Sequence, residues 1–580
     1  MFLDLYKDEL KKLHETGEAF SNEHPVLAPL LNGTSNDPDV ERLLEGTAFL
    51  TANINQKIND EFPEIVQSLM QIINPQYLRP VPAATIIKFT PKNNLSDTLH
   101  IPAGTYIDSI AVDGNTCRFK TCQDVDLLPL KITGFETEEL KSDGITVDQM
   151  ELKISFELYG TTLDNWQQKR LRFYLGGPFG NACDIYFLLQ YFLKEINIVN
   201  KQTGVTSSLD RRQLIPVGFD PADALLPYPA NLFPSYRILN EYFMFPEKFL
   251  FLDLALDQWS DRGTGNQFCV SFKCGIPPFV MPKINKDTFE LFTVPAVNLF
   301  DHDATPVQLT HQEKEVLLSP SGMKPGTYQI YSVDQVSGLM RGTPGKRQFI
   351  PFTDFQLRQN APVYQVVFRP SIRSSETDIF LSLAYPPGET LTDSEIMMAR
   401  ISCTNADLPA GLQAGDISKP TSNTPELATF KNLIPPTISH APALYGNLLW
   451  KLLADLSINT NSLSTIESLT ALLNHYIIQD NKDKPREIAN LRRVNSMYEM
   501  TVTPEERLFK RDVYRGQSIH IKTRSDQFAS LGDMFLFGSI LDYFFATYAS
   551  FNTYTALTFE DTAKWETIQW PPRLGTRPIL

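Results

Sequence analysis

The sequence predicts a multi-domain α+β protein, and three observations lead to this prediction. The chain has 580 residues, more than the roughly 250–300 at which a single hydrophobic core stops growing. Apolar residues follow a helical period to about residue 80, and again from about 443 to 478. Elsewhere, short runs of β-branched and aromatic residues alternate with turn residues, which is typical of strands.

We divide the chain into five predicted domains. They are an N-terminal helical domain (1–80), a first β-rich domain with one covering helix (81–213), a second β-rich domain (214–430), a helical hairpin (431–483) and a small C-terminal α+β module (484–580).

Two helices are predicted in the N-terminal domain. The first is indicated by apolar side chains at helical spacing, Leu3, Tyr6, Leu10, Leu13 and Phe20. In the second, Asp37 suits the N-cap, Pro38 suits the first turn, and Asp39 and Glu41 complement the helix dipole. Its apolar stripe continues to Ile73, and we expect Pro63 to break or restart the helix.

Strands are predicted from residue 83 onwards, at "AATIIKFTP", "LHIPAGTYID", "CRFKTC", "LKITGFETEEL" and "MELKISFELYG". The segment "NACDIYFLLQYFLKEI" (181–196) is long and apolar, and we expect it to form a helix that covers a sheet. The second β-rich domain begins with an aromatic- and proline-rich stretch and adds strands at "YQIYSVDQV", "VYQVVFRP" and "IFLSLAYP".

The C-terminal third is predicted to be helical and then mixed. Two helices are expected between about 443 and 478, with Ser464 and Glu467 forming a capping box at the second. Strands are expected at "IANLRRVNSMYEMTVTP" and "GQSIHIKTR". The apolar window 534–551 contains Asp542 and two tyrosines, so we interpret it as a buried helix rather than a membrane span.

Composition limits the classes of function. A formal net charge of −15 argues against a dedicated nucleic-acid binder and favours protein partners. Six cysteines are too few for a disulfide-stapled secreted fold, and the first residues lack the features of a signal peptide. We therefore expect a cytoplasmic protein.

Motifs for catalysis or cofactor binding are weak. Cys117 with Cys122, and Cys269 with Cys274, share a C-x4-C spacing without the further ligands that a metal site needs, so buried thiols are the favoured interpretation. Asp301–Asp303 with His311 is read as a polar turn, and "GTPGKR" (342–347) and "GTGNQF" (263–268) fail the phosphate-loop and dinucleotide patterns and are read as turns. We expect no catalytic residue, no metal and no cofactor, although glycosidase carboxylates could escape such a search.

Several longer phrases resemble the TssF (VasA/ImpG) family of type VI secretion system baseplate subunits, over nearly the whole chain. They include "VERLLEGTAFLTANINQKINDEFPEIVQSLMQIINPQYLRPVPA", "LLPYPANLFPSYRILNEYFMFPEKFLFLDL", "PAVNLFDHDATPVQL", "SCTNADLPAGL" and "WPPRLGTRPIL".

The resemblance implies a non-enzymatic scaffold. In this reading two TssF chains embrace one TssG, bind TssK and TssE, and surround the VgrG spike in wedges similar to those of contractile phage tails. The protein would be cytoplasmic, and partners would dock it at the cytoplasmic face of the inner membrane. A wedge protein of a phage or phage-like particle is the alternative within structural proteins, and a cytosolic carbohydrate-active enzyme is the alternative from another class.

Apolar helical stripes supply the candidate partner-interface residues. They are Leu43, Leu50, Ile54, Ile58, Ile65, Leu69, Leu449, Leu452, Leu456, Leu469 and Leu473. Burial of such stripes against other chains would stabilise an assembly by about 25 cal/mol per Å² before association costs. The sequence leaves open whether the stripes at 40–73 and 444–477 pack against partners or against the chain's own domains.

Overall fold

The structure is a computed structural model of the chain. It describes residues 6–575 apart from 8, 15, 17–37, 93–94, 96, 141–147, 230–233, 311–313, 341–345, 355–360, 372–376, 387–394, 443, 445–463, 480–481, 510–511 and 564–565. The chain divides into two compact units, Met1–Leu78 with Ala443–Leu453, and Arg79–Pro442 with Ala454–Leu580. The protein is a mixed α+β protein, as predicted, and sheets dominate the second unit.

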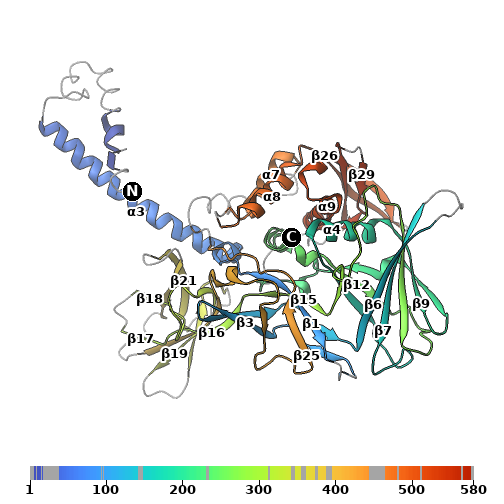
Figure 1. The fold of residues 1–580 in the computed structure, drawn as a ribbon. Coiled ribbons are helices and arrows are strands. Elements are labelled where there is room, and N and C mark those ends of the chain that lie inside the picture. Colours follow the sequence, from blue (N-terminus) through green and yellow to red (C-terminus); the bar gives the residue numbers. More distant parts are fainter. Residues whose placement is uncertain are drawn as a thin grey trace. The chain divides into compact units, whose positions relative to one another are not determined.

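The first unit is built around one long helix, α3 (Pro38–Ile73), with Asp39 and Glu41 in its first turn as predicted. A 3-10 turn follows at Pro75–Leu78. The predicted break at Pro63 is wrong, because α3 runs through it without interruption (Figure 1). A proline removes one backbone hydrogen bond, and a long helix accommodates that loss locally. The described residues between 6 and 16 are helical, whereas Asp37 lies outside the described part.

Three sheets form the body of the second unit. The six-stranded sheet has the order β24-β3-β4-β15-β1-β25, the five-stranded sheet β10-β9-β13-β7-β6, and the four-stranded sheet β11-β12-β8-β14. Their strands are β1 (Ala84–Pro91), β3 (Tyr106–Val112), β4 (Asn115–Thr121), β6 (Leu130–Leu140), β7 (Gln149–Leu158), β8 (Arg170–Leu175), β9 (Leu193–Asn200), β10 (Thr206–Leu209), β11 (Leu214–Pro216), β12 (Phe251–Ala255), β13 (Gln267–Gly275), β14 (Phe289–Leu291), β15 (Thr293–Val297), β24 (Ile417–Lys419) and β25 (Ala428–Asn432). The short strands β2 (Leu99–Ile101) and β5 (Val125–Leu127) form a separate pair.

Each of these sheets combines strands from both sides of the predicted border at 213/214. For example, β15 pairs antiparallel with β1, and β13 pairs with both β7 and β9. The sheets therefore do not follow that border. Hydrophobic periodicity locates a strand, but it does not identify the distant strand with which the first one pairs.

A fourth sheet lies between β15 and β24 in the sequence. Its order is β16-β23-β19-β20-β21-β22-β18, with β17 also pairing with β23. The strands are β16 (Phe300–Asp303), β17 (Val307–Leu309), β18 (Glu315–Leu317), β19 (Gln329–Met340), β20 (Arg347–Pro351), β21 (Val363–Pro370), β22 (Thr377–Ala384) and β23 (Glu395–Thr404). The chain thus leaves the six-stranded sheet after β15, builds this sheet, and returns to add β24 and β25.

Two predictions in the middle of the chain need correction. The helix predicted over 181–196 consists of α4 (Phe179–Phe187) and a π-helical turn (Leu188–Phe192), and its last four residues already belong to β9. Leu193, Ile196 and Ile198 are all buried in β9, so this stretch shows no alternation that would have distinguished a strand from a buried helix. The aromatic stretch at the start of the predicted second β-rich domain contains a helix, α5 (Pro234–Met244). The sequence did not predict this helix, because its aromatic residues also favour strands.

The C-terminal module also differs from its prediction. Helix α7 (Ile466–Tyr476) is confirmed, but its N-cap is Thr465, whose side chain accepts a hydrogen bond from the Ser468 amide, so the predicted Ser464 box is wrong. The segment predicted as a strand from residue 488 begins inside α8 (Lys484–Asn495). Asp483 caps that helix, and a proline lies in its first turn. Both residues precede Ile488, where the predicted strand segment begins, so this segment contains no signal for the start of the helix.

Helix α9 (Leu531–Tyr548) confirms the prediction of a buried helix, since nearly all its side chains are buried. It packs on the sheet formed by β26 (Glu499–Phe509), β27 (Asp512–Thr523), β28 (Thr553–Asp561), β29 (Glu566–Gln569) and β30 (Arg573–Leu574). Gly538 makes the close approach possible, because a Cβ there would lie 2.3 Å from the Trp570 ring. The Trp570 Nε1–H donates to the Ser539 hydroxyl at 3.0 Å.

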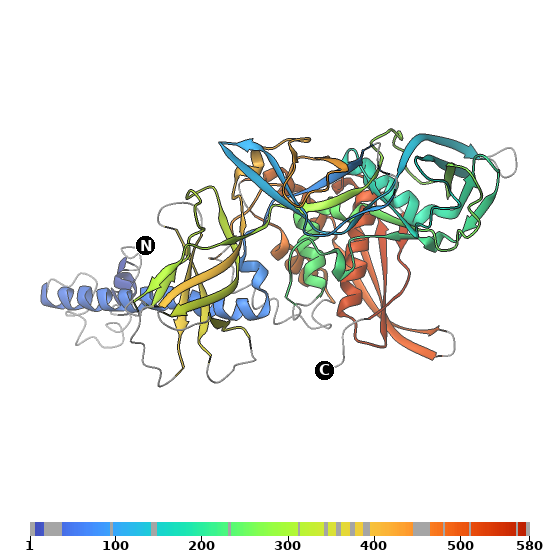
Figure 2. The same ribbon diagram turned by 90° about the horizontal axis from the view of Figure 1, so that it is seen from below.

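The β26–β27 hairpin extends beyond the rest of its sheet. The two strands pair from Glu499 to Phe509, whereas β28 joins β27 only from Arg515 onwards. Figure 2 shows this hairpin projecting from the C-terminal sheet.

Candidate functional site

Helix α3 carries two apolar faces. Ala48, Ala52, Val66 and Met70 are at most 4% exposed and form one of them. Leu43, Leu50, Ile65 and Leu69 are 43–72% exposed. At about 100° per residue, the exposed group falls within an arc of about 100° that does not overlap the buried group. We call these four exposed residues the α3 apolar surface.

The α3 apolar surface consists of four of the predicted interface residues. Large apolar side chains exposed along one face of a helix suit an interface with a partner. Ile54 and Ile58 belong to α3, but their side chains lie outside the described part of the structure.

The other predicted interface residues lie in the segment 449–473. Leu449, Leu452 and Leu456 lie outside the described residues. Leu469 and Leu473 on α7 are fully buried within the chain. Their helical spacing thus reflects packing inside this protein, and we leave both out of the surface proposed below.

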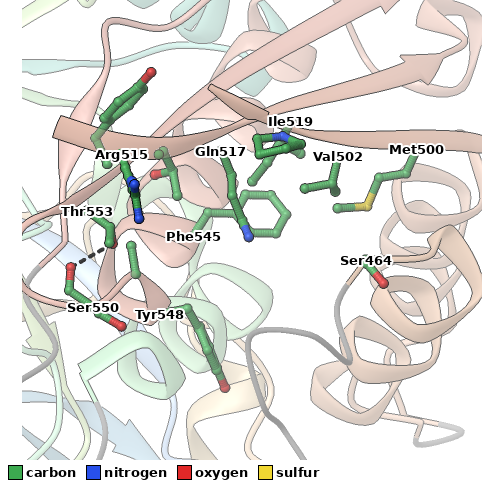
Figure 3. Close-up of a pocket in the computed structure, with 15 residues that line it drawn as sticks. Ser464, Met500, Val502, Arg515, Gln517, Ile519, Phe545, Tyr548, Ser550 and Thr553 are labelled. Atoms are coloured by element: carbon green, nitrogen blue, oxygen red, sulfur yellow. Dashed lines mark hydrogen bonds between the residues drawn. The ribbon is translucent and has the colours of Figure 1, made fainter. Parts of the chain in front are cut away.

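A groove in the C-terminal module is a second candidate, one that the sequence did not reveal. It has a volume of about 470 Å³ and lies between the β26–β27–β28 face and the end of α9. Figure 3 shows Val502 and Ile519 on the strands and Phe545 and Tyr548 on the helix around it. Nearby, the Thr553 hydroxyl donates to the Ser550 carbonyl at 2.7 Å (Figure 3). We call this cavity the C-terminal groove.

The cysteines are buried thiols in the interpretation favoured from sequence. Burial raises the pKa of Cys117 to about 11 and the pKa of Cys274 to about 12, so both stay protonated at neutral pH. All six cysteines are free. Among the described residues, no group of three or more His, Cys, Asp or Glu side chains could hold a metal ion.

The other motifs are structural where they can be seen. Asp301–Asp303 belongs to β16 and pairs with β23, so its reading as a turn is wrong. Asp301 and Asp303 are exposed on this strand, which accounts for the polar residues. The His302 ring Nε2 lies 2.9 Å from the Ser321 carbonyl oxygen. His311 lies outside the described residues. Gly263 and Gly265 adopt positive φ in a turn before β13, as predicted.

Residues 342–345 of "GTPGKR" lie outside the described residues. The flanking strands β19 and β20 pair antiparallel, with Gly338 opposite Arg347. This pairing is the one expected of a hairpin.

One buried carboxyl group gives a pH-dependent prediction. Burial raises the pKa of Asp542 on α9 to about 6, although Arg573 donates a hydrogen bond to it and opposes the shift. Between about pH 4 and pH 6 the folded chain therefore binds more protons than the unfolded chain, so the free energy of unfolding falls as pH rises through this window. The shift corresponds to about 3 kcal/mol.

Asp542→Asn is expected to remove that pH dependence, because the amide cannot ionise. The check is the free energy of unfolding of the C-terminal module in urea at pH 4.5 and at pH 7.0, with tryptophan fluorescence as the signal. Asp261→Asn, at an exposed position, is the matched control. An unchanged pH dependence in Asp542→Asn would contradict the assignment.

Within the described part of the chain, no helix combines the length and apolar character needed to cross a bilayer. Comparison with known proteins gives a consistent picture. A family model described as "Type VI secretion system, TssF" matches residues 1–577. The curated Type VI secretion system component TssF1 of Pseudomonas aeruginosa is 26% identical over 636 residues, which cover 100% of this chain and 99% of that protein.

Two solved structures are similar. A chain in the cryo-electron microscopy structure of the type VI secretion system TssK-TssF-TssG baseplate subcomplex has a TM-score of 0.77 and 27% identity, covering 92% of this chain and 98% of its own. A chain in the baseplate complex from the type VI secretion system has a TM-score of 0.60 and 22% identity, with both chains covered completely. The second likeness concerns the fold alone.

Proposed function

Because the chain belongs to the TssF family of type VI secretion system components, we propose that it holds neighbouring baseplate subunits in a fixed arrangement through the α3 apolar surface. It is a baseplate subunit of that system. The family is structural rather than enzymatic. This assignment replaces the two alternatives from sequence, a phage wedge protein and a carbohydrate-active enzyme.

The observation that supports the proposal most directly is the second apolar face of α3. Leu43, Leu50, Ile65 and Leu69 are exposed although each is large and apolar. Burying such a side chain fully contributes about 1.5–3 kcal/mol. Helices with exposed apolar stripes dock against the grooves of partner helices, so a helical partner suits this surface.

We further propose the partners and location that the resemblance implies. TssK and TssG stand beside TssF in the similar subcomplex, and we propose both as partners here. A second copy of this chain, with two copies per TssG, and contacts to TssE and the VgrG spike complete the proposed wedge. The protein would work in the cytoplasm and reach the inner membrane through its partners.

We keep the five predicted segments as proposed units of assembly, although each of the three body sheets combines strands from both sides of the border at 213/214. Residues 1–80 and 431–483 would supply helical elements to the wedge, and the β-rich parts and the module 484–580 would shape its outer surfaces.

Co-expression tests the proposal. The chain is produced with TssG and TssK from the same genome, purified through a tag on TssG, and weighed by native mass spectrometry. We expect a complex that contains two copies of this chain per TssG. A chain that never co-purifies with TssG, although it is folded when purified alone, would overturn the proposal.

A further inference from the structure

The C-terminal groove continues a surface that is elsewhere part of the core. In the β26–β27 pairing, Val502 lies opposite Ile519 and Met500 lies opposite Ile521. Adjacent pairs two residues apart share one face of the sheet. Ile521 is fully buried, whereas Val502 is only partly buried. The face is therefore covered at one end, and beyond the end of α9 at Tyr548 it opens into the groove.

The same face continues to the tip of the hairpin. Leu508 and Val513 lie opposite each other and are 70% and 64% exposed. Their positions are an even number of residues from Val502 and Ile519, so they lie on the same face of the hairpin. At the end of the groove that is nearer to this tip, Arg515 Nε donates to Glu506 at 3.1 Å.

One buried polar group of the groove, the Thr555 hydroxyl, lacks a hydrogen-bond partner among the described residues. Its residue is 5% exposed. Thr555 lies beside Gln517 in the register of β27 and β28, so both side chains share the groove face. A buried hydroxyl without a partner costs free energy that a bound polar group would recover.

The charge of the groove is unusual for this chain. Its one charged lining residue is Arg515, and no carboxylate lines it among the described residues. The whole chain, in contrast, carries a formal charge of −15. The Arg515 and Glu506 side chains are 84% and 62% exposed, so their pair is weak and leaves guanidinium N–H groups for a further acceptor.

We propose that the C-terminal groove docks a peptide segment of another protein that presents a large apolar side chain followed closely by a carboxylate. The apolar side chain fills the space between Val502, Ile519 and Phe545. The carboxylate of the segment forms an ion pair with the Arg515 guanidinium. A backbone carbonyl of the segment accepts a hydrogen bond from the Thr555 hydroxyl. Pro504 lies in the edge strand β26 and disfavours addition of the segment as a further strand, so the segment lies on the face instead.

The test uses the full-length chain and overlapping synthetic peptides that span TssG and TssK from the same genome, a choice of probes that rests on the proposed function. Peptides that span this chain itself are included as further probes. Binding is measured by fluorescence anisotropy. We expect at least one TssG or TssK peptide with an apolar–acidic pair to bind.

Two variants and one control locate the binding. Arg515→Glu and Val502→Asp are each expected to weaken binding at least about tenfold. Arg492→Glu, at an exposed position on α8, is expected to leave it unchanged. Circular dichroism and thermal unfolding confirm that each variant is folded.

Three outcomes would overturn the inference. They are the absence of any binding TssG or TssK peptide, binding that Arg515→Glu and Val502→Asp leave unchanged, and binding confined to peptides of this chain. None depends on the α3 apolar surface, so the outcome is separate from that of the co-expression experiment.

Discussion

Leu50→Asp is expected to abolish stable association of this chain with TssG and its other baseplate partners. Leu50 lies on the α3 apolar surface and is 64% exposed, so the free chain tolerates a charge at this position. In an assembly that buries the surface, the same carboxylate loses its hydration and has no apolar contact to replace it. We expect association to weaken at least about 100-fold, or about 3 kcal/mol.

Pull-down and native mass spectrometry with TssG and TssK measure this effect. Val280→Asp is the matched control, because Val280 is an apolar residue that is 92% exposed outside α3. If the folded Leu50→Asp chain enters the complex with wild-type affinity, the α3 apolar surface is not an interface. Leu452→Asp applies the same test to the segment 445–463.

The sequence predicted the interface candidates only in part, for a physical reason. A helical stripe of leucines arises whether the helix packs on its own chain or on another. Leu43 and Leu469 both fit such a stripe, yet Leu43 is 72% exposed and Leu469 is fully buried. Periodicity therefore gives the face of a helix, and only the tertiary structure shows what covers that face.

Local patterns predicted the strands better than they predicted the helix borders. Strand β21 occupies the residues of the predicted run "VYQVVFRP". In contrast, β-branched and aromatic residues concealed α5, and reading from Ile488 missed the cap of α8 at Asp483. Short apolar runs suit either state, and the cap that decides between them lies outside the run.

The C-terminal groove could not be predicted at all. Its walls come from three strands and the end of α9, and the antiparallel register that joins Val502 to Ile519 is set by a long-range fold. Leu508 and Val513 are apolar residues close to the hairpin turn, but their exposure is known only from the structure.

Arg493→Leu is expected to destabilise the C-terminal module by about 3–5 kcal/mol. The Arg493 Nε lies 3.1 Å from each carboxylate oxygen of Asp533, and Asp533 is completely buried. The same carboxylate accepts the Ala529 amide at 3.0 Å near the start of α9. The pair thus fastens α8 to the first turn of α9, and Arg493 also lies over the Phe179 ring of α4.

Removing the guanidinium leaves a buried carboxylate without a counter-charge, which costs far more than the intact pair contributes. The double variant Arg493→Leu with Asp533→Asn is therefore expected to recover most of the loss. Arg524→Leu removes an exposed pair with Asp526, whose side chains are 57% and 49% exposed, and is expected to change stability by only about 0–1 kcal/mol.

Urea unfolding of the three variants, with hydrogen exchange of α8 and α9, distinguishes these cases. Asp533 keeps its role in the first turn of α9 in Arg493→Leu, so the loss reports the uncompensated charge and not a missing cap. A loss in Arg493→Leu no larger than that in Arg524→Leu would mean that Asp533 is not held as a buried charge. Failure of the double variant to recover would instead place the loss in the packing of the arginine stem on Phe179.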